Sequence, residues 1–227
     1  MKPTKIDEIT VRIRSLDGSI AVEEHRGEIV TVKQITPNDL VDVFRNSAVA
    51  PKHIPTGFLP ANCLSVNIYD HKKEVVIWHP SLCADVTYQQ TLYEHFPLPR
   101  LVFAFGIDPE GKTSTHRMAV ITDEKPTPET RVYEYPFSNV YTHTGICIGA
   151  ANSMPTHKSL RTLAALPNFI LSLPNNDHMY TAANNKLHLG YRELMEHLKD
   201  KPPEYYYDKV LVPRKGTLQD FIDDKIK

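Results

Sequence analysis

The chain has 227 residues, of which 41% are hydrophobic and 23% are charged, and its formal net charge is −1 at pH 7. This content suffices for the core of one large domain, and the near-zero charge argues against nucleic acid as the main partner, because phosphate binding requires a basic excess. No apolar run is long enough to span a membrane and the first residues do not resemble a signal peptide, so we expect a cytoplasmic protein.

The first part of the sequence is typical of a small antiparallel sheet. Three segments alternate apolar and polar residues, which is the period of a half-buried strand, and Asp17-Gly18 marks a hairpin turn. These segments are residues 9–14, 20–24 and 29–34. Thr36, Pro37 and Asp39 then predict a helix start, with a hydroxyl N-cap, proline at the first helical position and an acid at the third.

The middle of the chain predicts an antiparallel meander. The predicted strands are residues 63–69, 74–78, 101–105, 116–122 and 131–135. Residues 80–99 show no clear period and are expected to be irregular. The two prolines within residues 125–128 predict an extended connection rather than a helix.

After Cys147 the pattern becomes helical. Residues 160–170 keep a helical spacing that Pro167 should break or kink, and residues 187–198 form a clear amphipathic pattern. A capping pattern at residues 217–220 predicts a final helix. This order of strands, helix, meander and helices predicts an α+β fold.

The three cysteines, Cys63, Cys83 and Cys147, are odd in number and have no CxxC spacing. This fits neither a disulfide framework nor a zinc site, and the histidines have no metal-ligand spacing, so we expect no metal. A single cysteine is most often a small buried hydrophobic residue, and we interpret Cys63 and Cys83 in that way.

Cys147 has a different setting, because it lies between two isoleucines after a Thr-Gly turn, and Asn139 precedes it by eight residues. An accessible thiolate can carry an acyl group, and an aligned amide donor that stabilises the oxyanion is worth about 2.7–4 kcal/mol. Residues 140–145 are long enough to fold the chain back toward Cys147. On these residues alone, a turn capped by Asn139 and a buried Cys147 are the favoured interpretation.

The motif Asn139-Val140-Tyr141 followed by Gly145-Ile146-Cys147-Ile148 resembles the active-site signature of ubiquitin-conjugating enzymes, with the spacing of that family. Residues 97–147 resemble more closely a bacterial branch, PRTRC system protein B (prokaryotic ubiquitin-conjugating family D). The segments that carry this second resemblance are 125–133 and 136–140.

Three features of the signature are absent from this sequence. The family's His-Pro before the asparagine is Phe137-Ser138, the aspartate after the cysteine is Gly149, and the tryptophan expected further on is missing, since Trp78 is the only one. The bracing of the asparagine loop and the handling of the acceptor amine are therefore expected to differ from the family pattern.

The resemblance implies a ubiquitin-conjugating fold over residues 36–227, with an antiparallel meander packed on helices and an N-terminal β extension over residues 1–35. It also implies a ubiquitin-like protein held as a thioester on Cys147, a ThiF-like activating enzyme that supplies it, and Asn139 as the oxyanion donor. A JAB-type protease is a further implied member of the pathway. No cofactor is implied at this step, because the activating enzyme consumes the ATP.

Weaker candidates lie on either side of the cysteine. His143 can tune the thiolate or assist the incoming amine, or it is a solvated loop histidine. Asp177-His178 lies where such enzymes often place an acid near the incoming lysine, and a solvated loop is the alternative. Residues 205–207, three tyrosines, form either a partner-binding patch or a packed linker.

Two other functions remain open from the sequence. One is a hydrolase with Cys147 as nucleophile and His143 or His178 as base. The other is a binding module of the same fold that has lost catalysis, which the presence of both Asn139 and Cys147 disfavours.

Overall fold

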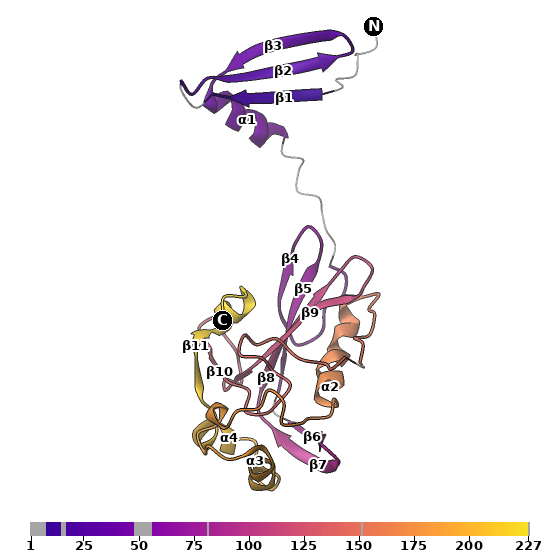
Figure 1. Ribbon diagram of the computed structural model, residues 1–227, viewed down its shortest axis with the longest axis vertical. Coiled ribbons are helices and arrows are strands. Elements are labelled where there is room, and N and C mark those ends of the chain that lie inside the picture. The colour runs from indigo at the N-terminus through magenta and orange to yellow at the C-terminus, as the bar shows by residue number, and fades with distance from the viewer. Residues whose placement is uncertain (1–7, 15–16, 48–55, 81, 151, 227) are drawn as a thin grey trace. The chain divides into compact units, whose positions relative to one another are not determined.

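The computed structural model of this chain describes residues 8–14, 17–47, 56–80, 82–150 and 152–226. The chain forms two compact units, Met1–Pro55 and Thr56–Lys227, whose elements are labelled in Figure 1.

The first unit is a three-stranded antiparallel sheet followed by a helix. Its elements are β1 (Glu8–Ile13), β2 (Ile20–Arg26), β3 (Ile29–Ile35) and α1 (Pro37–Ser47), and the sheet order is β1-β2-β3. Thr36 N donates to Asp39 Oδ2 over 2.9 Å and Asp39 N donates to Thr36 Oγ1 over 3.1 Å. This reciprocal capping box confirms the predicted helix start.

The predicted domain boundary at residue 35 falls inside this first unit. Thr36 caps α1 directly after β3 ends, without a spacer, and the helix is grouped with the three strands. The compact unit runs to Pro55, and the division of the chain into two domains at residue 35 stays a prediction.

The second unit is built on a six-stranded antiparallel sheet that contains the predicted meander. Its strands are β4 (Cys63–Ile68), β5 (Lys73–His79), β8 (Leu101–Ile107), β9 (Thr113–Ile121), β10 (Arg131–Tyr133) and β11 (Pro213–Thr217). They are ordered β11-β10-β9-β8-β5-β4, so the strand near the C-terminus completes an edge of the sheet.

A separate hairpin lies between β5 and β8 in the sequence, and it corrects the expectation that residues 80–99 are irregular. Its strands are β6 (Leu82–Tyr88) and β7 (Thr91–Leu98). Two features explain why the sequence pattern does not predict this hairpin. The tight turn uses Gln89 at a φ of 53° where a glycine would be the usual signal, and a register shift between Ala84 and Val86 interrupts the alternation.

The two faces of the large sheet bury different clusters. Along β8, Phe103 and Phe105 point to one face and Val102 and Ala104 to the other, and all four are fully buried. The first cluster joins the sheet to the hairpin and to the helices that follow the cysteine, through Phe96, Leu163, Leu166, Leu194, Leu198 and Tyr206. The second is smaller and is covered by Leu218, Phe221 and Ile226.

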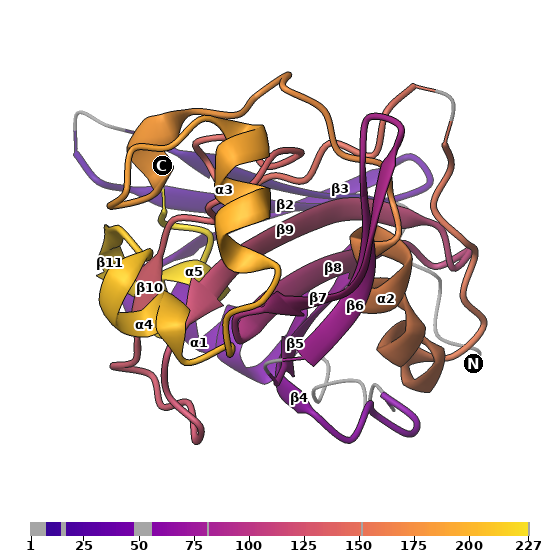
Figure 2. The same ribbon diagram turned by 90° about the horizontal axis from the view of Figure 1, so that it is seen from below.

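The helices of the second unit are short. They are η1 (Leu160–Ala165), α2 (Leu166–Leu171), η2 (Ala182–Asn184), α3 (Tyr191–Leu198), α4 (Tyr205–Lys209) and α5 (Leu218–Ile222), where η denotes a 3₁₀ helix. Figure 2 shows α3 and the β6–β7 hairpin in front of β8 and β9, with which their apolar side chains pack.

Helix boundaries follow from local chemistry. Pro167 lies in the first turn of α2, so the predicted break is a change from 3₁₀ to α geometry. The predicted helix over residues 187–198 begins only at Tyr191, because Gly190 is its N-cap. Thr217 and Asp220 form the predicted capping box of α5.

The fold is thus mixed α and β, and it is dominated by antiparallel sheets, as the sequence predicted. Among the described residues, no helix has the length and apolar character needed to cross a membrane.

Candidate active site

Asn139 and Cys147 are brought together by a closed turn. Cys147 N–H donates to the Asn139 carbonyl over 2.8 Å, and Tyr141 N–H donates to the Gly145 carbonyl over 2.8 Å. Thr144 N–H closes the tip by donating to the Tyr141 carbonyl over 2.9 Å. The two predicted residues therefore face each other across the base of a small hairpin, which we call the cysteine turn (residues 139–147).

The cysteine turn is fastened to β9. Ile146 N–H donates to the His116 carbonyl over 3.0 Å, and Met118 N–H donates to the Thr144 carbonyl over 2.9 Å. The Ile146 side chain is buried in the first cluster. Since Cys147 follows this anchored residue directly, its position is set by the sheet rather than by a free loop.

Two residues of the turn have left-handed backbone conformations. Asn139 has a φ of 65° and Thr144 a φ of 70°. Asparagine tolerates this region, whereas a β-branched residue seldom enters it. The Thr144 hydroxyl is also buried without a hydrogen-bond partner among the described residues. The turn is therefore strained at Thr144 and is held in shape by its surroundings.

The Cys147 side chain is half-buried and lies beside Tyr141. The hydrogen bond and the charge interaction between the Tyr141 hydroxyl and the Cys147 sulfur raise the pKa of Tyr141 above its usual value. The Tyr141 hydroxyl thus lies close to the Cys147 sulfur.

His143 is exposed and stacks on Tyr141, with ring centroids 5.2 Å apart and planes inclined by 13°. A Cβ atom at Gly145 would lie 2.8 Å from His143 Nε2, so the glycine lets this ring lie over the turn. The structure therefore places His143 against Tyr141 and Gly145, and the predicted role of His143 toward the thiolate stays a prediction.

The Asn139 side chain reaches a second segment, which we call the 174–178 loop. Asn139 Nδ2 donates to the Pro174 carbonyl over 3.1 Å. In the same loop, Asp177 accepts from the Tyr88 hydroxyl over 2.5 Å and from Gln89 Nε2 over 2.8 Å. Asp177 thus binds the tip of the β6–β7 hairpin, and burial together with this bond raises the pKa of Tyr88 to about 12. His178 is exposed.

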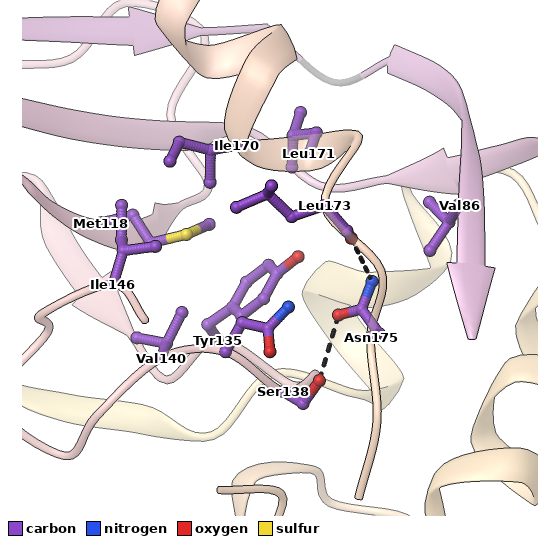
Figure 3. A pocket seen from close by; sticks show the side chains of 11 residues that line it. Val86, Met118, Tyr135, Ser138, Val140, Ile146, Ile170, Leu171, Leu173 and Asn175 are labelled. Atoms are coloured by element: carbon purple, nitrogen blue, oxygen red, sulfur yellow. Dashed lines mark hydrogen bonds between the residues drawn. The ribbon is translucent and has the colours of Figure 1, made fainter. Parts of the chain in front are cut away.

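Ser138 and Asn175 join the two segments in the interior; the sequence marked Ser138 only as a departure from the family signature and did not predict its partner. Ser138 is fully buried and its hydroxyl donates to Asn175 Oδ1 over 3.1 Å. Figure 3 shows this bond beside a cavity of about 20 Å³, which is enough for about one water molecule. The cavity is lined by Asn139, Tyr135 and apolar side chains of the first cluster.

Arg214 of β11 supports the cysteine turn from the other end of the chain. Arg214 Nη1 donates to Glu134 over 2.7 Å, and Nη2 donates to the Thr142 carbonyl. The only signal for this contact in the sequence would be the charge of Arg214, which does not reveal its target.

The other candidates have structural contacts. Tyr206 is fully buried and donates to the Pro97 carbonyl over 2.8 Å, so at least the centre of the tyrosine run is packed in α4. Cys63 is half-buried, but Cys83 is exposed on β6, which corrects its expected burial. Among the described residues, no cluster of three or more histidine, cysteine or acidic side chains could hold a metal ion.

Comparison with known proteins places this site in a family. The family model described as prokaryotic E2 family D matches residues 38–214, a range that includes α1, the cysteine turn, the 174–178 loop and Arg214. No curated protein sequence and no solved structure matches the chain. The resemblance to PRTRC system protein B stays a prediction. Since the match covers well over half of the 227 residues, this chain belongs to prokaryotic E2 family D.

Proposed function

We propose that this chain is a ubiquitin-conjugating-like enzyme that carries the C-terminal carboxyl of a ubiquitin-like protein as a thioester on Cys147 and transfers it to an amine. The observation that carries the proposal is the 2.8 Å hydrogen bond from Cys147 N–H to the Asn139 carbonyl, which holds both residues at one site. Family membership supports the same reading.

The chemistry consists of two acyl transfers. In the first, the Cys147 thiolate attacks the carbonyl carbon of an incoming thioester, and the thiolate of the donor leaves. In the second, an amine attacks the new thioester, the Cys147 thiolate leaves and the amine loses a proton. Each transfer passes through a tetrahedral oxyanion, and in the transfer to the amine Asn139 supplies the amide donor that stabilises it.

The Asn139 amide has hydrogens for two bonds. One is directed at the Pro174 carbonyl, and no described residue accepts the other. The second hydrogen can therefore bind the oxyanion while the first keeps the side chain attached to the Pro174 carbonyl.

The family implies two partners. A ThiF-like activating enzyme would adenylate the ubiquitin-like protein and pass it to Cys147, and the ubiquitin-like protein would be the cargo. Since the activating step consumes ATP, we place the reaction in the cytoplasm.

A labelled peptide thioester tests the carrier role without knowledge of the natural cargo. The probe is a fluorescein-labelled peptide ending in Gly-Gly, prepared as its mercaptoethanesulfonate thioester. We expect the intact chain to exchange onto Cys147 and to release the label with dithiothreitol, and Cys147→Ala to take up little label. Cys83→Ser is the matched control, because Cys83 is the exposed cysteine of β6. Equal labelling of Cys147 and Cys83 would count against an activated site.

The same reaction separates the carrier from a hydrolase. A carrier holds the thioester until an amine arrives, whereas a hydrolase would turn over an amide substrate steadily in the absence of an activating enzyme. The contacts of His143 are with Tyr141 and Gly145, and no described contact joins either predicted base to Cys147, so no observation favours the hydrolase.

A further inference from the structure

Two neighbouring residues at the start of the cysteine turn, Ser138 and Asn139, bind two neighbouring residues of the 174–178 loop. Ser138 donates to Asn175 in the interior, and Asn139 donates to the Pro174 carbonyl at the surface. We propose that Ser138 and Asn175 form a buried clamp whose function is to position the Asn139 amide for the transfer reaction. This inference rests on the proposed function of Cys147.

The side-chain amide of Asn175 and the hydroxyl of Ser138 both have hydrogen-bond partners for their polar atoms. Asn175 is 7% exposed and its Oδ1 accepts from Ser138, while its Nδ2 lies 3.3 Å from the Leu173 carbonyl and 3.4 Å from the Thr87 carbonyl. The Ser138 hydroxyl in turn accepts from Asn176 N–H over 3.4 Å. A buried amide with these partners is confined to one orientation.

The clamp also fixes the 174–178 loop to the hairpin. Asn175 N–H donates to the Thr87 carbonyl over 2.7 Å, and Gln89 N–H donates to the Asn175 carbonyl over 2.8 Å. These two bonds continue the end of β6 as a short parallel bridge between Tyr88 and Asn175. The loop is thus attached to secondary structure on one side and to Ser138 on the other.

The consequence for Asn139 is geometric. Its backbone is fixed to Cys147 N–H, and its side chain is fixed to the carbonyl of the residue just before Asn175. If Ser138 no longer holds Asn175, the loop keeps only its attachment to the hairpin, and the Pro174 carbonyl that orients the Asn139 amide is less firmly positioned. A misplacement of about 1 Å at a reacting group can cost about 100-fold in rate.

The departure from the family signature is consistent with this role. The positions that carry His-Pro in the signature carry Phe137 and Ser138 here. Phe137 packs in the first cluster, and Ser138 supplies the buried hydroxyl. The clamp therefore provides this chain with its own brace for the asparagine.

The experiment measures loading and discharge separately, with the labelled peptide thioester for loading and free lysine for discharge. We expect Ser138→Ala and Asn175→Ala to load at the rate of the intact chain and to discharge about tenfold more slowly. The matched controls are Ser172→Ala, which caps the C-terminus of α2 and whose hydroxyl donates to the Phe169 carbonyl, and Asn168→Ala, an exposed asparagine of that helix. Both controls should discharge normally.

A second background tests whether the clamp acts through Asn139. In the Asn139→Ala background, Ser138→Ala should lower the melting temperature as it does alone but should not slow discharge further. A purely structural role would slow discharge by the same factor in both backgrounds, and that result would overturn the clamp. Normal discharge of Ser138→Ala alone would also overturn it.

The failure of the clamp and the failure of the proposed function give different results. If the intact chain loads and discharges but the Ser138 and Asn175 variants match it, only the clamp is wrong. If the intact chain takes up no peptide on Cys147, the thioester carrier is wrong and the clamp is wrong with it.

Discussion

The two faces of the six-stranded sheet are stabilised by different means. The face that supports the cysteine turn is packed by long apolar side chains from the hairpin and from α2, α3 and α4. The opposite face has a smaller apolar cluster. It also buries the ion pair between Arg117 and Glu74, with 2.8 Å between Nη2 and Oε1. Arg117 also donates to the Phe221 carbonyl over 2.7 Å, which ties α5 to the sheet.

One strand takes part in both faces. The backbone of β9 pairs with the cysteine turn through His116 and Met118, while the side chain of Arg117 lies between them in sequence and points to the opposite face. Adjacent residues of β9 thus contribute to opposite faces, one that supports the candidate site and one that contributes only to stability. Substitutions on the two faces should therefore affect different measurements.

The largest expected effect is at Cys147, on the face of the site. Cys147→Ser should replace the thioester with an oxyester, because a serine hydroxyl forms an ester with the same carboxyl. When the chain is loaded by the activating enzyme of its pathway, the adduct should persist in dithiothreitol, whereas that of the intact chain is released. No adduct on the serine variant would contradict the carrier role, and its urea unfolding curve should match the parent.

The next effect is on the opposite face and concerns stability alone. Glu74→Ala removes the buried carboxylate partner of Arg117 and leaves only the exposed carboxylate of Asp224, 3.1 Å from Nη1, so it should lower the free energy of unfolding by about 3 kcal/mol, the lower end of the range for a broken buried pair. The matched control is Glu124→Ala, which removes the 82% exposed partner of Arg100 and should cost about 1 kcal/mol or less. Urea titration measures both variants. A discharge rate that fell for loaded Glu74→Ala would break the separation of the two faces.

Asn139 should show the reverse pattern, with a large change in chemistry and a small one in stability. Asn139→Ala should load normally but discharge about 100-fold more slowly, because one oxyanion donor is lost. Asn139→Gly is the sharper variant, since glycine accepts the φ of 65° without strain. Equal discharge defects in the two variants would assign the effect to the amide, and normal discharge in the glycine variant would remove Asn139 from the mechanism.

The smallest effect is a pH dependence of stability that originates at two histidines shielded from solvent, His116 and His157. Burial lowers the pKa of His116 and of His157 below the usual value of 6.5. As the pH falls below about 6.5, the unfolded chain binds protons at these positions before the folded chain does, so stability should fall, by at most about 1.4 kcal/mol per pH unit for each group.

Urea titrations from pH 7.5 to 5.5 measure this slope. His116→Gln should remove part of it, and His157→Gln should remove another part. A stability that rises on acidification, or a slope that neither variant changes, would show that burial of these rings does not govern the response.

The sequence predicted the parts of the fold that depend on local patterns. Alternation located the strands of the meander, and Thr36 and Thr217 marked helix starts because capping acts over three residues. The hairpin over residues 82–98 could not be predicted, since its turn lacks glycine and its alternation is interrupted. Cys83 was expected to be buried because a single cysteine usually is, and its exposed position on β6 could not be inferred without the hairpin.

In the candidate site, the pairing of Asn139 with Cys147 was predictable because a short turn fixes it. The partners of the turn were not. Ser138 and Asn175 are 37 residues apart, and Arg214 lies 72 residues from Thr142. Serine, asparagine and arginine are common at surfaces, so nothing in their identity reveals a distant target.

The long sequence separations have a consequence for synthesis of the chain. The cysteine turn is fastened to β9 soon after it is made, but its support from Asn175 and Arg214 requires segments that the ribosome releases later. A nascent chain that ends before residue 214 holds Cys147 without the complete support of the turn. Transfer from the proposed thioester should thus become efficient only when these later segments have folded.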